Sequence, residues 1–512
     1  MPDPTPHHDD ATSPVVQTEP ADRTAAEVPP GPPLDVDVLV IGAGIAGVDV
    51  ACRLSRHCPD TLWAVLEARD AIGGTWDLFR YPGIRSDSDM YTLGFPFRPW
   101  RGASSIAPGD EIRDYVQATA HDEGVTERVH VGQHVERLDW SSGDERWTVT
   151  SRTRHGLVRH TARFVYLATG YYSYASGHVV EFAGEADFAG EVVHPQAWPE
   201  GLPVAGRRVV VIGSGATAIT LLPALVDEGV ASVTMLQRSP SYVAALPSRD
   251  VVADGLRAVL PDAVAHRLVR GKNVLLSTAS YQVLRRYPEP GRRMLRRRAT
   301  RLLPEGYPVD THFAPQYNPW DQRLCVAPDG DLFDALSGGR ADVVTGTIER
   351  FERAGIRLTS GELLEADVVV TATGLQMEVA GGADIVVDGA PVDLSGRHVY
   401  KGAMLSGVPN LAMAVGYTNA SWTLRADLSA RWFCSLLRHL DRHDLTVATP
   451  RYDEPEAGER PLLDLTSGYV QRAAHLLPRQ GHRRPWRVVQ SYVYDVAVTR
   501  LSRVDDGHLE LS

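Results

Sequence analysis

Cysteine is scarce in this chain of 512 residues, and it occurs only as Cys52, Cys58, Cys325 and Cys434. No two of these cysteines form a C-x-x-C pair, which argues against a disulfide framework, a zinc site and a dithiol redox centre. We therefore expect four reduced thiols, no bound metal and a cytoplasmic location.

Long apolar runs and an excess of positive charge are also missing. No stretch approaches the roughly 20 apolar residues that a membrane-spanning helix needs. The formal net charge is -12, and an acidic chain is a poor candidate for a nucleic-acid-binding protein. Residues 1–33 are rich in Pro, Ala, Thr and acidic residues but have no basic start or apolar core. They predict a disordered tail and exclude a secretory signal.

A dinucleotide-binding pattern follows the tail directly. The apolar run Val36–Ile41 predicts a buried parallel strand, and a helical pattern starts a few residues later. Between them lies G-x-G-x-x-G, made by Gly42, Gly44 and Gly47. Such glycines allow a tight turn, a close approach of a pyrophosphate to the backbone, and close packing of helix on strand. The next strand ends at Glu67, where an acid that binds ribose hydroxyls belongs.

The same pattern occurs a second time, with one informative difference. Residues 209–212 predict the strand, and the turn G-x-G-x-x-A contains Gly213, Gly215 and Ala218. The following strand ends at Arg238, a cation where the first site has an acid. Arginine can bind a ribose 2′-phosphate through two parallel hydrogen bonds. The two sites therefore predict FAD and NADPH, and because no cysteine pair is available as acceptor, molecular oxygen is the remaining candidate.

The predicted fold class is α/β, with two Rossmann-like dinucleotide-binding domains, the second inserted into the first, and a helical subdomain. Apolar strands end in A-T-G twice, at residues 168–170 and 372–374. Each A-T-G is interpreted as a strand end where the chain passes a bound nucleotide and crosses between units. We predict a tail at 1–33, an FAD-binding domain at 34–180 and 370–450, an NADPH-binding domain at 181–369 with a helical insertion at about 250–315, and a C-terminal extension at 451–512.

The helical insertion is strongly basic. Its arginines crowd a short span: Arg285, Arg286, Arg292, Arg293, Arg296, Arg297, Arg298 and Arg301. The simplest interpretation is a solvated helical cap whose arginines pair with acidic residues elsewhere. Peripheral contact with an anionic membrane and binding of phosphate groups are the alternatives.

Two stretches carry a family resemblance: IGGTWDLFRYPGIRSDSDMYTLGFPFRPW at residues 72–100 and FAGEVVHPQAWP at residues 188–199. Together they resemble the class B flavin monooxygenases, and the Baeyer–Villiger monooxygenases in particular. The second stretch matches the group's fingerprint F-x-G-x-x-x-H-x-x-x-W-P, whereas the heteroatom-oxidising sister group ends the pattern with Tyr or Phe. GGTWDLFRYPGIRSDSDMYTLG, YNPWDQRLC and GYTNASWT are most similar to the ethionamide-activating branch, which oxidises ketones and the sulfur of thioamides.

The resemblance implies the residues that hold both cofactors. Those implied for FAD are Gly42, Gly44, Ala46, Gly47, Glu67, Gly74, Thr75, Trp76, Asp77, Leu78, Asp87 and Val135. Those implied for NADPH are Arg85, Ser86, Gly213, Ser214, Gly215, Ala216, Thr217, Ala218, Arg238 and Ser239. One departure concerns Gln322, which stands where many relatives have a lysine that helps to bind the 2′-phosphate. Selectivity for NADPH should therefore depend more on Arg238.

The resemblance also implies that Arg323 is the active-site arginine and that Asp87 holds it in place. A fixed guanidinium stabilises both a flavin C4a-peroxide anion and the oxyanion that forms on a substrate carbonyl. The predicted function is an NADPH- and oxygen-dependent Baeyer–Villiger monooxygenase that converts ketones into esters or lactones via a C4a-peroxyflavin. Oxygenation of sulfur or nitrogen, and an uncoupled NADPH oxidase that releases hydrogen peroxide, are the alternatives.

Two further expectations concern segments outside the turns. His194 and Trp198 are expected to lock a linker between the two domains by hydrogen bonding and packing, and direct catalysis by His194 is the less favoured interpretation. The stretch GYTNASWTLRADLSARWF, with Asn419, Trp422 and Leu424, is expected to line a mostly apolar substrate pocket.

Overall fold

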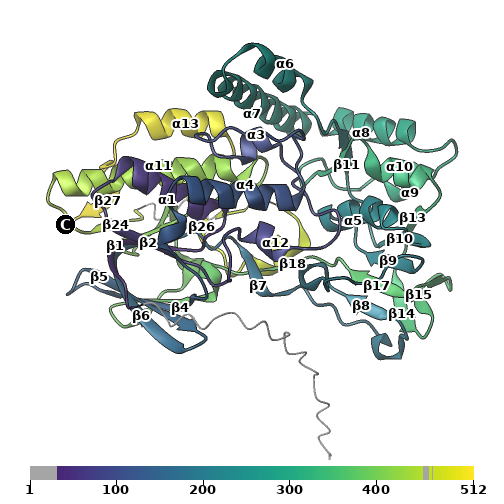
Figure 1. Cartoon of the computed structure of the whole chain (residues 1–512), viewed down its shortest axis with the longest axis horizontal. Helices are drawn as coiled ribbons and strands as arrows, with labels where there is room; N and C mark the ends of the chain where they lie inside the picture. The colour runs from purple at the N-terminus through teal and green to yellow at the C-terminus, as the bar shows by residue number, and fades with distance from the viewer. Residues whose placement is uncertain (1–31, 454–459, 464) are drawn as a thin grey trace, which may run out of the picture.

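The structure, a computed structural model, describes residues 32–453, 460–463 and 465–512 (Figure 1). Nearly all of the tail predicted at 1–33 lies outside the described residues. The described chain forms two main sheets with helices around them, which confirms the predicted α/β fold class. Among the described helices, none combines the length and the apolar character needed to span a bilayer.

The first sheet has eleven strands in the described part of the chain. Its main path runs β20-β19-β4-β5-β6-β1-β2-β3, with β1 parallel to both β2 and β6. Its strands are β1 (Asp35–Ile41), β2 (Trp63–Leu66), β3 (Val129–His130), β4 (His134–Ser141), β5 (Arg146–Thr153), β6 (Gly156–Leu167), β19 (Asp384–Val387), β20 (Ala390–Pro391), β21 (Val399–Tyr400), β22 (Met404–Leu405) and β23 (Leu411–Met413).

The first nucleotide turn lies between β1 and the helix α1 (Ile45–His57). The strand forms because Val38, Leu39, Val40 and Ile41 are all buried, as a central parallel strand requires. α1 packs between the sheet and α11 (Trp422–Arg442). The other helices next to this sheet are α2 (Thr75–Leu78), α3 (Met90–Leu93) and α4 (Gly109–Asp122).

The second sheet is entirely parallel, in the order β13-β10-β9-β17-β8. Its strands are β8 (Glu191–Val193), β9 (Arg208–Ile212), β10 (Ser232–Gln237), β13 (Ala341–Thr345) and β17 (Val368–Thr371). Helices α5 (Ala216–Asp227) and α10 (Asp331–Ser337) pack with it in one buried cluster. A small antiparallel sheet adjoins it, made by β14 (Ile348–Glu352), β15 (Gly355–Leu358) and β16 (Leu363–Glu365).

The second sheet is an insertion in the first. The chain leaves the first sheet after β6 and returns at β19, which pairs with β4 in parallel, and β23 later pairs with β6. The two crossings, β7 (Tyr172–Gly177) and β18 (Leu375–Met377), pair with each other as an antiparallel ribbon between the two sheets (Figure 1). The exact domain limits at residues 180 and 370 stay predictions.

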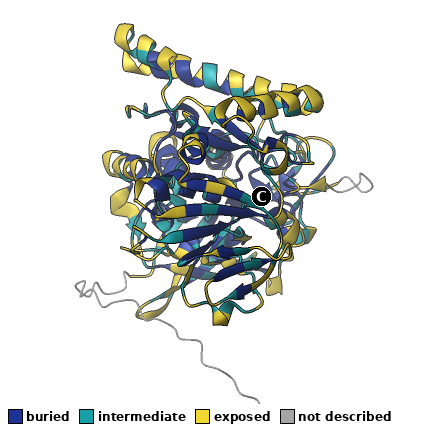
Figure 2. Ribbon diagram, turned by 90° about the vertical axis from the view of Figure 1, so that its right-hand side faces the viewer, coloured by how far each residue is buried: buried dark blue, intermediate teal, exposed yellow. Residues whose placement is uncertain are grey.

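A group of helices stands out from the second unit. They are α6 (Val251–Val259), α7 (Asp262–Arg286), α8 (Pro288–Leu302) and α9 (Val309–His312), with strands β11 (Val243–Leu246) and β12 (Cys325–Pro328) at their base. Figure 2 shows the long helices at the top of the molecule, with exposed residues along their outer side.

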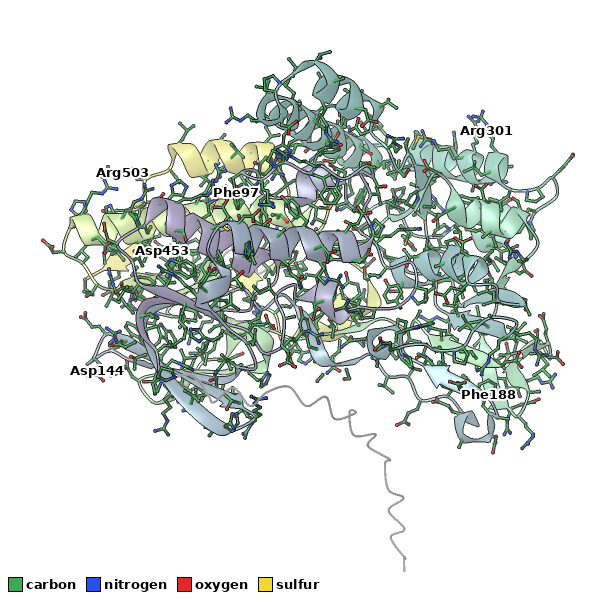
Figure 3. All side chains as sticks on the ribbon, in the orientation of Figure 1. Phe97, Asp144, Phe188, Arg301, Asp453 and Arg503 are labelled. Carbon is green, nitrogen blue, oxygen red and sulfur yellow. The ribbon has the colours of Figure 1, made fainter. Side chains whose placement is uncertain are left out.

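The last part of the chain returns to the first unit. It contains α12 (Gly468–Ala473) and α13 (Tyr492–Leu501), together with β24 (Ala448–Pro450), β25 (Arg460–Pro461), β26 (Arg479–Gln480) and β27 (Leu509–Leu511). Side chains cover both units densely (Figure 3). α12 lies against β18 and so reaches the ribbon between the sheets.

Candidate functional site

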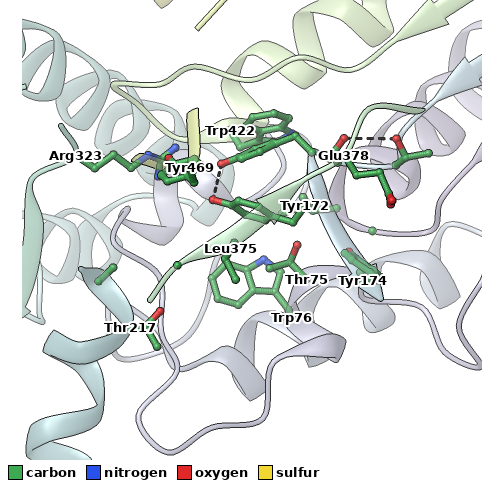
Figure 4. A pocket seen from close by; sticks show the side chains of 18 of the residues that line it. Thr75, Trp76, Tyr172, Tyr174, Thr217, Arg323, Leu375, Glu378, Trp422 and Tyr469 are labelled. Atoms are coloured by element: carbon green, nitrogen blue, oxygen red, sulfur yellow. Dashed lines mark hydrogen bonds between the residues drawn. The ribbon is translucent and has the colours of Figure 1, made fainter. Parts of the chain in front are cut away.

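A cavity of about 900 Å³ lies between the two glycine-rich turns, and both turns line it. Its wall also includes the ribbon strand β7, the loop before β12 and the helix α12. Figure 4 shows Arg323 on one side of this cavity and Trp76, Tyr172 and Trp422 on its other walls. Residues far apart in the sequence therefore meet at one site.

At the first turn the cavity is lined by glycine main chain that no side chain covers. Gly42 has a φ of +101°, and a Cβ there would lie 2.7 Å from the carbonyl oxygen of Ala168, the first residue of the first A-T-G. Gly44 and Gly74 lie back to back, because a Cβ on Gly74 would lie 2.8 Å from the Cα of Gly44. A Cβ on Gly47 would lie 1.9 Å from the Gly42 oxygen. The bare backbone fits a pyrophosphate.

Glu67 stands at the end of β2 in the same cavity. Its carboxylate accepts hydrogen bonds from the backbone N–H of Ala43 at 2.6 Å and of Arg69 at 2.9 Å. Burial raises the pKa of the Glu67 carboxyl, and the two backbone donors oppose that shift. A carboxylate has about four acceptor positions, so Glu67 can hold the turn and still accept from ribose hydroxyls.

The second turn repeats this geometry. Gly213 has a φ of +133°, and a Cβ there would lie 2.3 Å from the carbonyl oxygen of Ala372, the first residue of the second A-T-G. A Cβ on Gly215 would meet open space, which leaves room for a phosphate beside the start of α5. The Ser214 hydroxyl donates to the Ser239 carbonyl at 3.0 Å and lies 2.9 Å from the Ser241 hydroxyl.

Arg238 follows β10 and lines the cavity with an exposed side chain. Its neighbour Gln237 is buried and donates to the carbonyl of His312 and the hydroxyl of Thr345, each at 2.9 Å. These bonds fix the strand end from which Arg238 projects. No acidic partner of Arg238 is found in the described part of the chain, so its fork of donors is available to an anionic ligand.

Arg323 and Asp87 meet at the cavity wall from distant parts of the sequence. The Nη1 atom of Arg323 lies 3.4 Å from a carboxylate oxygen of Asp87, and both side chains are partly buried. The buried Nε–H of Arg323 has no hydrogen-bond partner among the described residues. Since a guanidinium is always charged, this site offers a fixed cation with a free donor.

Arg85 bridges the two units. It pairs with Asp331 at the start of α10, and its Nη2 atom lies 3.3 Å from the Asp331 carboxylate. Burial raises the pKa of the Asp331 carboxyl, and the Arg85 cation counteracts this. The buried Nε–H of Arg85 also lacks a hydrogen-bond partner in the described structure.

Most of the residues expected at the cofactors line this one cavity. They are Gly42, Gly44, Ala46, Glu67, Gly74, Thr75, Trp76, Arg85, Ser86, Asp87, Val135, Gly213, Ser214, Gly215, Ala216, Thr217, Arg238 and Arg323.

Five expected residues lie behind the wall instead. Gly47 and Ala218 pack α1 and α5 onto their strands, and Leu78 packs against the second core. The Asp77 carboxylate is buried between Arg69 and Arg80. Ser239 acts through its backbone carbonyl, as described above.

The sequence interpretation missed an aromatic wall. It consists of Tyr171, Tyr172, Tyr174 and Tyr469. Burial raises the pKa of Tyr174 and Tyr469 to about 12, so these phenols are neutral. The run Tyr171-Tyr172 directly after the first A-T-G was an available signal. Tyr469 and its neighbour Arg472 belong to a C-terminal segment in which no motif marks them.

Of Asn419, Trp422 and Leu424, which were expected at the substrate pocket, only Trp422 lines the cavity. Trp422 lines the cavity and stacks near Tyr171, with ring centroids 4.8 Å apart. Leu424 is buried in a separate apolar cluster. Asn419 donates to the carbonyl of Gln490 at 3.0 Å. Neither Asn419 nor Leu424 is among the residues that line the cavity.

His194 and Trp198 lie at the base of the ribbon. The Nδ1 atom of His194 accepts from the backbone N–H of Gln196 at 3.1 Å, and a Cβ on Gly177 would lie 1.9 Å from the imidazole. Gln196 in turn donates to the carbonyl of Ser173 on β7. Trp198 packs against the second core. Burial lowers the pKa of His194, so the ring is a neutral packing element at neutral pH.

The site contains no obvious redox or metal centre made by side chains. All four cysteines are buried free thiols. Burial raises the pKa of the Cys325 thiol to about 12, which makes this cavity residue unreactive. No cluster of metal-binding side chains occurs in the ranges that the structure describes.

Comparisons of the sequence with known proteins agree with this geometry. Residues 39–257 match the family model described as pyridine nucleotide-disulphide oxidoreductase. The chain is 49% identical over 477 residues to the FAD-containing monooxygenase EthA of Mycobacterium tuberculosis, covering 93% of this chain and 98% of that protein. It is 48% identical to EthA of Mycolicibacterium smegmatis over 93% of this chain and 97% of that protein.

Comparisons with solved structures give the same fold. A cyclohexanone monooxygenase in an open crystal form matches with a TM-score of 0.74 and 20% identity, over 94% of this chain and 100% of that chain. An oxidised steroid monooxygenase bound to NADP matches with a TM-score of 0.73 and 20% identity, over 93% and 99%.

Proposed function

The chain belongs to the FAD-containing class B flavin monooxygenases, and from this membership we propose that it is a Baeyer–Villiger monooxygenase that converts ketones into esters or lactones. The observation that carries the proposal is the position of Arg323, a permanent cation on the wall of a cavity bounded by both dinucleotide turns. In this family the first turn serves FAD and the second serves NADPH. Bound FAD, reduced by NADPH, supplies activation of O2, so that ketone, O2, NADPH and a proton give ester, water and NADP+.

The residues of this chain divide the remaining work. Gly42, Gly44 and Glu67 are proposed to hold the adenine dinucleotide part of FAD at the first turn, while Arg238 binds the 2′-phosphate of NADPH. The guanidinium of Arg323 lines the cavity, and we propose that it stabilises negative charge that develops on the carbonyl oxygen of the ketone. Asp87 orients Arg323 from 3.4 Å away.

The walls select the substrate and exclude water. Tyr171, Tyr172, Tyr469 and Trp422 provide aromatic surface, which suits a largely apolar ketone. Burial raises the pKa of the Tyr172 and Tyr469 phenols, so these two hydroxyl groups stay protonated at neutral pH.

Replacement of Arg323 tests the proposal. The Arg323→Ala variant should keep its flavin content and much of its NADPH oxidation but lose ester formation by about 10²–10³-fold, the usual cost of a lost oxyanion donor. Arg323→Lys should restore only part of the activity, because a lysine keeps the charge without the planar fork. Products from linear, cyclic and aryl ketones and from thioethers are identified by mass, together with the yield of hydrogen peroxide.

A neighbouring arginine provides the matched control. Arg285 is an arginine on α7 outside the cavity lining, and it pairs with Asp321 at 2.7 Å. Because its side chain does not reach the cavity, Arg285→Ala should form ester nearly as the unaltered protein does. Ester formation that persists in Arg323→Ala refutes the role of Arg323. Unaltered protein that gives only sulfoxides, or only hydrogen peroxide, refutes ketone oxidation in favour of heteroatom oxygenation or an uncoupled oxidase.

A further inference from the structure

The helices α6, α7 and α8 present an apolar surface to solvent, which we call the outer helical face. α7 exposes a stripe of aliphatic side chains at helical spacing. Val264, Leu268, Leu275, Leu276 and Val283 are between 42% and 61% exposed. On α6, Val251 and Val259 are 78% and 76% exposed. Large apolar side chains that gather on one exposed side of a fold mark an interaction surface.

The inner side of α7 is firmly anchored, so the exposure is not a sign of a loosely packed helix. Arg270 is buried and donates to the carbonyls of Tyr91 and Gly94 at 2.7 and 2.8 Å. Ala265, Val269 and other inner residues are buried. Figure 2 shows the same division, with buried residues toward the body and exposed residues along the top. The fold holds the apolar stripe outward.

Positive charge is concentrated on α7, which carries the stripe, and on the adjoining helix α8. Between Ala263 and Leu303 the sequence has eleven Lys and Arg residues and one acidic residue, in a chain whose net charge is -12. Three of the arginines, Arg285, Arg292 and Arg296, pair with acidic residues, as a solvated cap would require. The others that are exposed have no acidic partner within the described ranges: Arg267, Arg286, Arg293, Arg297, Arg298 and Arg301. Figure 3 shows Arg301 projecting from α8 away from the body.

We propose that the outer helical face binds the surface of an anionic lipid bilayer. Exposed aliphatic side chains beside unpaired arginines are what a helix needs to lie in the interface of such a membrane. A second copy of this chain fits the surface less well. A symmetric dimer would place the same face against itself and so bring unpaired arginines together without acids between them. This interaction goes beyond the oxygenation chemistry and does not depend on it.

Vesicle flotation of the full chain with FAD bound tests the proposal. The protein should float with vesicles of phosphatidylcholine that contain about 30% phosphatidylglycerol, and it should not float with vesicles of pure phosphatidylcholine. Sodium chloride at 0.5 M should weaken binding because it screens the charges. The charge-reversed variant Arg297→Glu/Arg298→Glu/Arg301→Glu should bind more than tenfold more weakly, since each arginine near the surface contributes about fivefold. Leu268→Ser/Leu275→Ser should also lose binding.

Matched substitutions far from this face control for exposure and charge. Leu157 and Arg159 are exposed on β6 in the first sheet, and Leu157→Ser/Arg159→Glu should leave binding unchanged. Equal flotation with neutral and anionic vesicles overturns the proposal. Absent flotation together with a dimer that Leu268→Ser/Leu275→Ser abolishes also overturns it and assigns the face to a second copy.

Discussion

Four arginines line the cavity, and they differ in whether an acid neutralises them. Arg85 pairs with Asp331 and Arg323 with Asp87, whereas Arg238 and Arg472 have no acidic partner in the described structure. A paired arginine is held in one orientation, and an unpaired one is available to an incoming anion. The pairing therefore separates the two arginines that are held in one orientation, Arg85 and Arg323, from the two whose donors no acid engages.

The preference for NADPH over NADH should depend on Arg238. Arg238→Ala is expected to raise the KM for NADPH about tenfold to a hundredfold, because a charged hydrogen bond contributes about 1.5–3 kcal/mol. The KM for NADH should hardly change, since NADH has no 2′-phosphate. Steady-state kinetics with both coenzymes measure the difference.

Arg472 provides the control for that experiment, because it is the other unpaired arginine of the cavity. It lies near Gly374, away from the end of β10. Arg472→Ala should leave the ratio of the two KM values unchanged. Equal effects of Arg238→Ala on NADPH and NADH would remove Arg238 from the 2′-phosphate site.

At the residue scale, the turns were predictable and the walls were not. Glycines and the residue at the following strand end occur at fixed spacing because a phosphate and a ribose fix the distance between them. Glu67 and Arg238 therefore line the cavity where the spacing placed them. Tyr469 and Arg472 reach the cavity only because α12 packs against β18, and that contact between distant segments leaves no local pattern.

At the element scale, α1 and α11 are held together by a buried ion pair. The Nε atom of Arg53 on α1 donates to Asp427 on α11 at 2.7 Å, and Arg431 approaches the same carboxylate at 2.9 Å. Asp49 is buried beside them, and its carboxyl pKa is raised by burial first and by the charge of Asp427 second. Burial therefore favours the protonated form of Asp49 beside this ion pair.

Removing the charge of Asp427 should destabilise the protein. Asp427→Asn leaves Arg53 buried without a charged partner, which should lower the free energy of unfolding by about 3–5 kcal/mol. Ionisation of Asp49, which can replace the lost charge of Asp427, should keep this decrease at about 3 kcal/mol. Glu123→Gln breaks the exposed pair that Arg56, also on α1, makes with Glu123, and should cost less than about 1 kcal/mol. Denaturant unfolding followed by fluorescence measures both, and equal losses would contradict the prediction.

The positions of helices and strands could be predicted from the sequence where an apolar run lies next to a glycine-rich turn. β1 and β9 each begin one residue before the expected start and end at the expected residue, and α1 begins in the expected place directly after the glycine turn. α11 was the exception, because its stretch was expected at a substrate pocket. Fourteen of its 21 residues are buried, mostly against α1 and the first sheet, and burial on that scale needs partners that a single segment does not reveal.

At the scale of the whole molecule, stability should decline in acid. His160 in the first sheet and His266 on α7 are both buried, and burial lowers the pKa of each to about 4. The unfolded chain binds these protons near pH 6.5. Stability is therefore fully present above about pH 6.5 and falls as the pH drops toward 4, by on the order of 3 kcal/mol for each histidine.

Removing His266 should weaken this dependence. In His266→Gln, the free energy of unfolding should change less steeply between pH 6.5 and 4 than in the unaltered protein, since one titrating group is lost. Denaturant unfolding at several pH values measures the slope. A slope that stays the same in His266→Gln would show that other groups control the acid sensitivity.

The back-to-back approach of Gly44 and Gly74 decides where such a catalyst can be remodelled. A side chain added at Gly74 would place its Cβ 2.8 Å from the Cα of Gly44, so Gly74 cannot be enlarged unless the backbone moves. Tyr469 and Arg472 come from a separate short helix on the opposite side, where a substitution alters shape without disturbing the turn. Substitutions intended to change which substrates the cavity accepts should therefore be made at Tyr469 and Arg472, and Gly44 and Gly74 should be left unchanged.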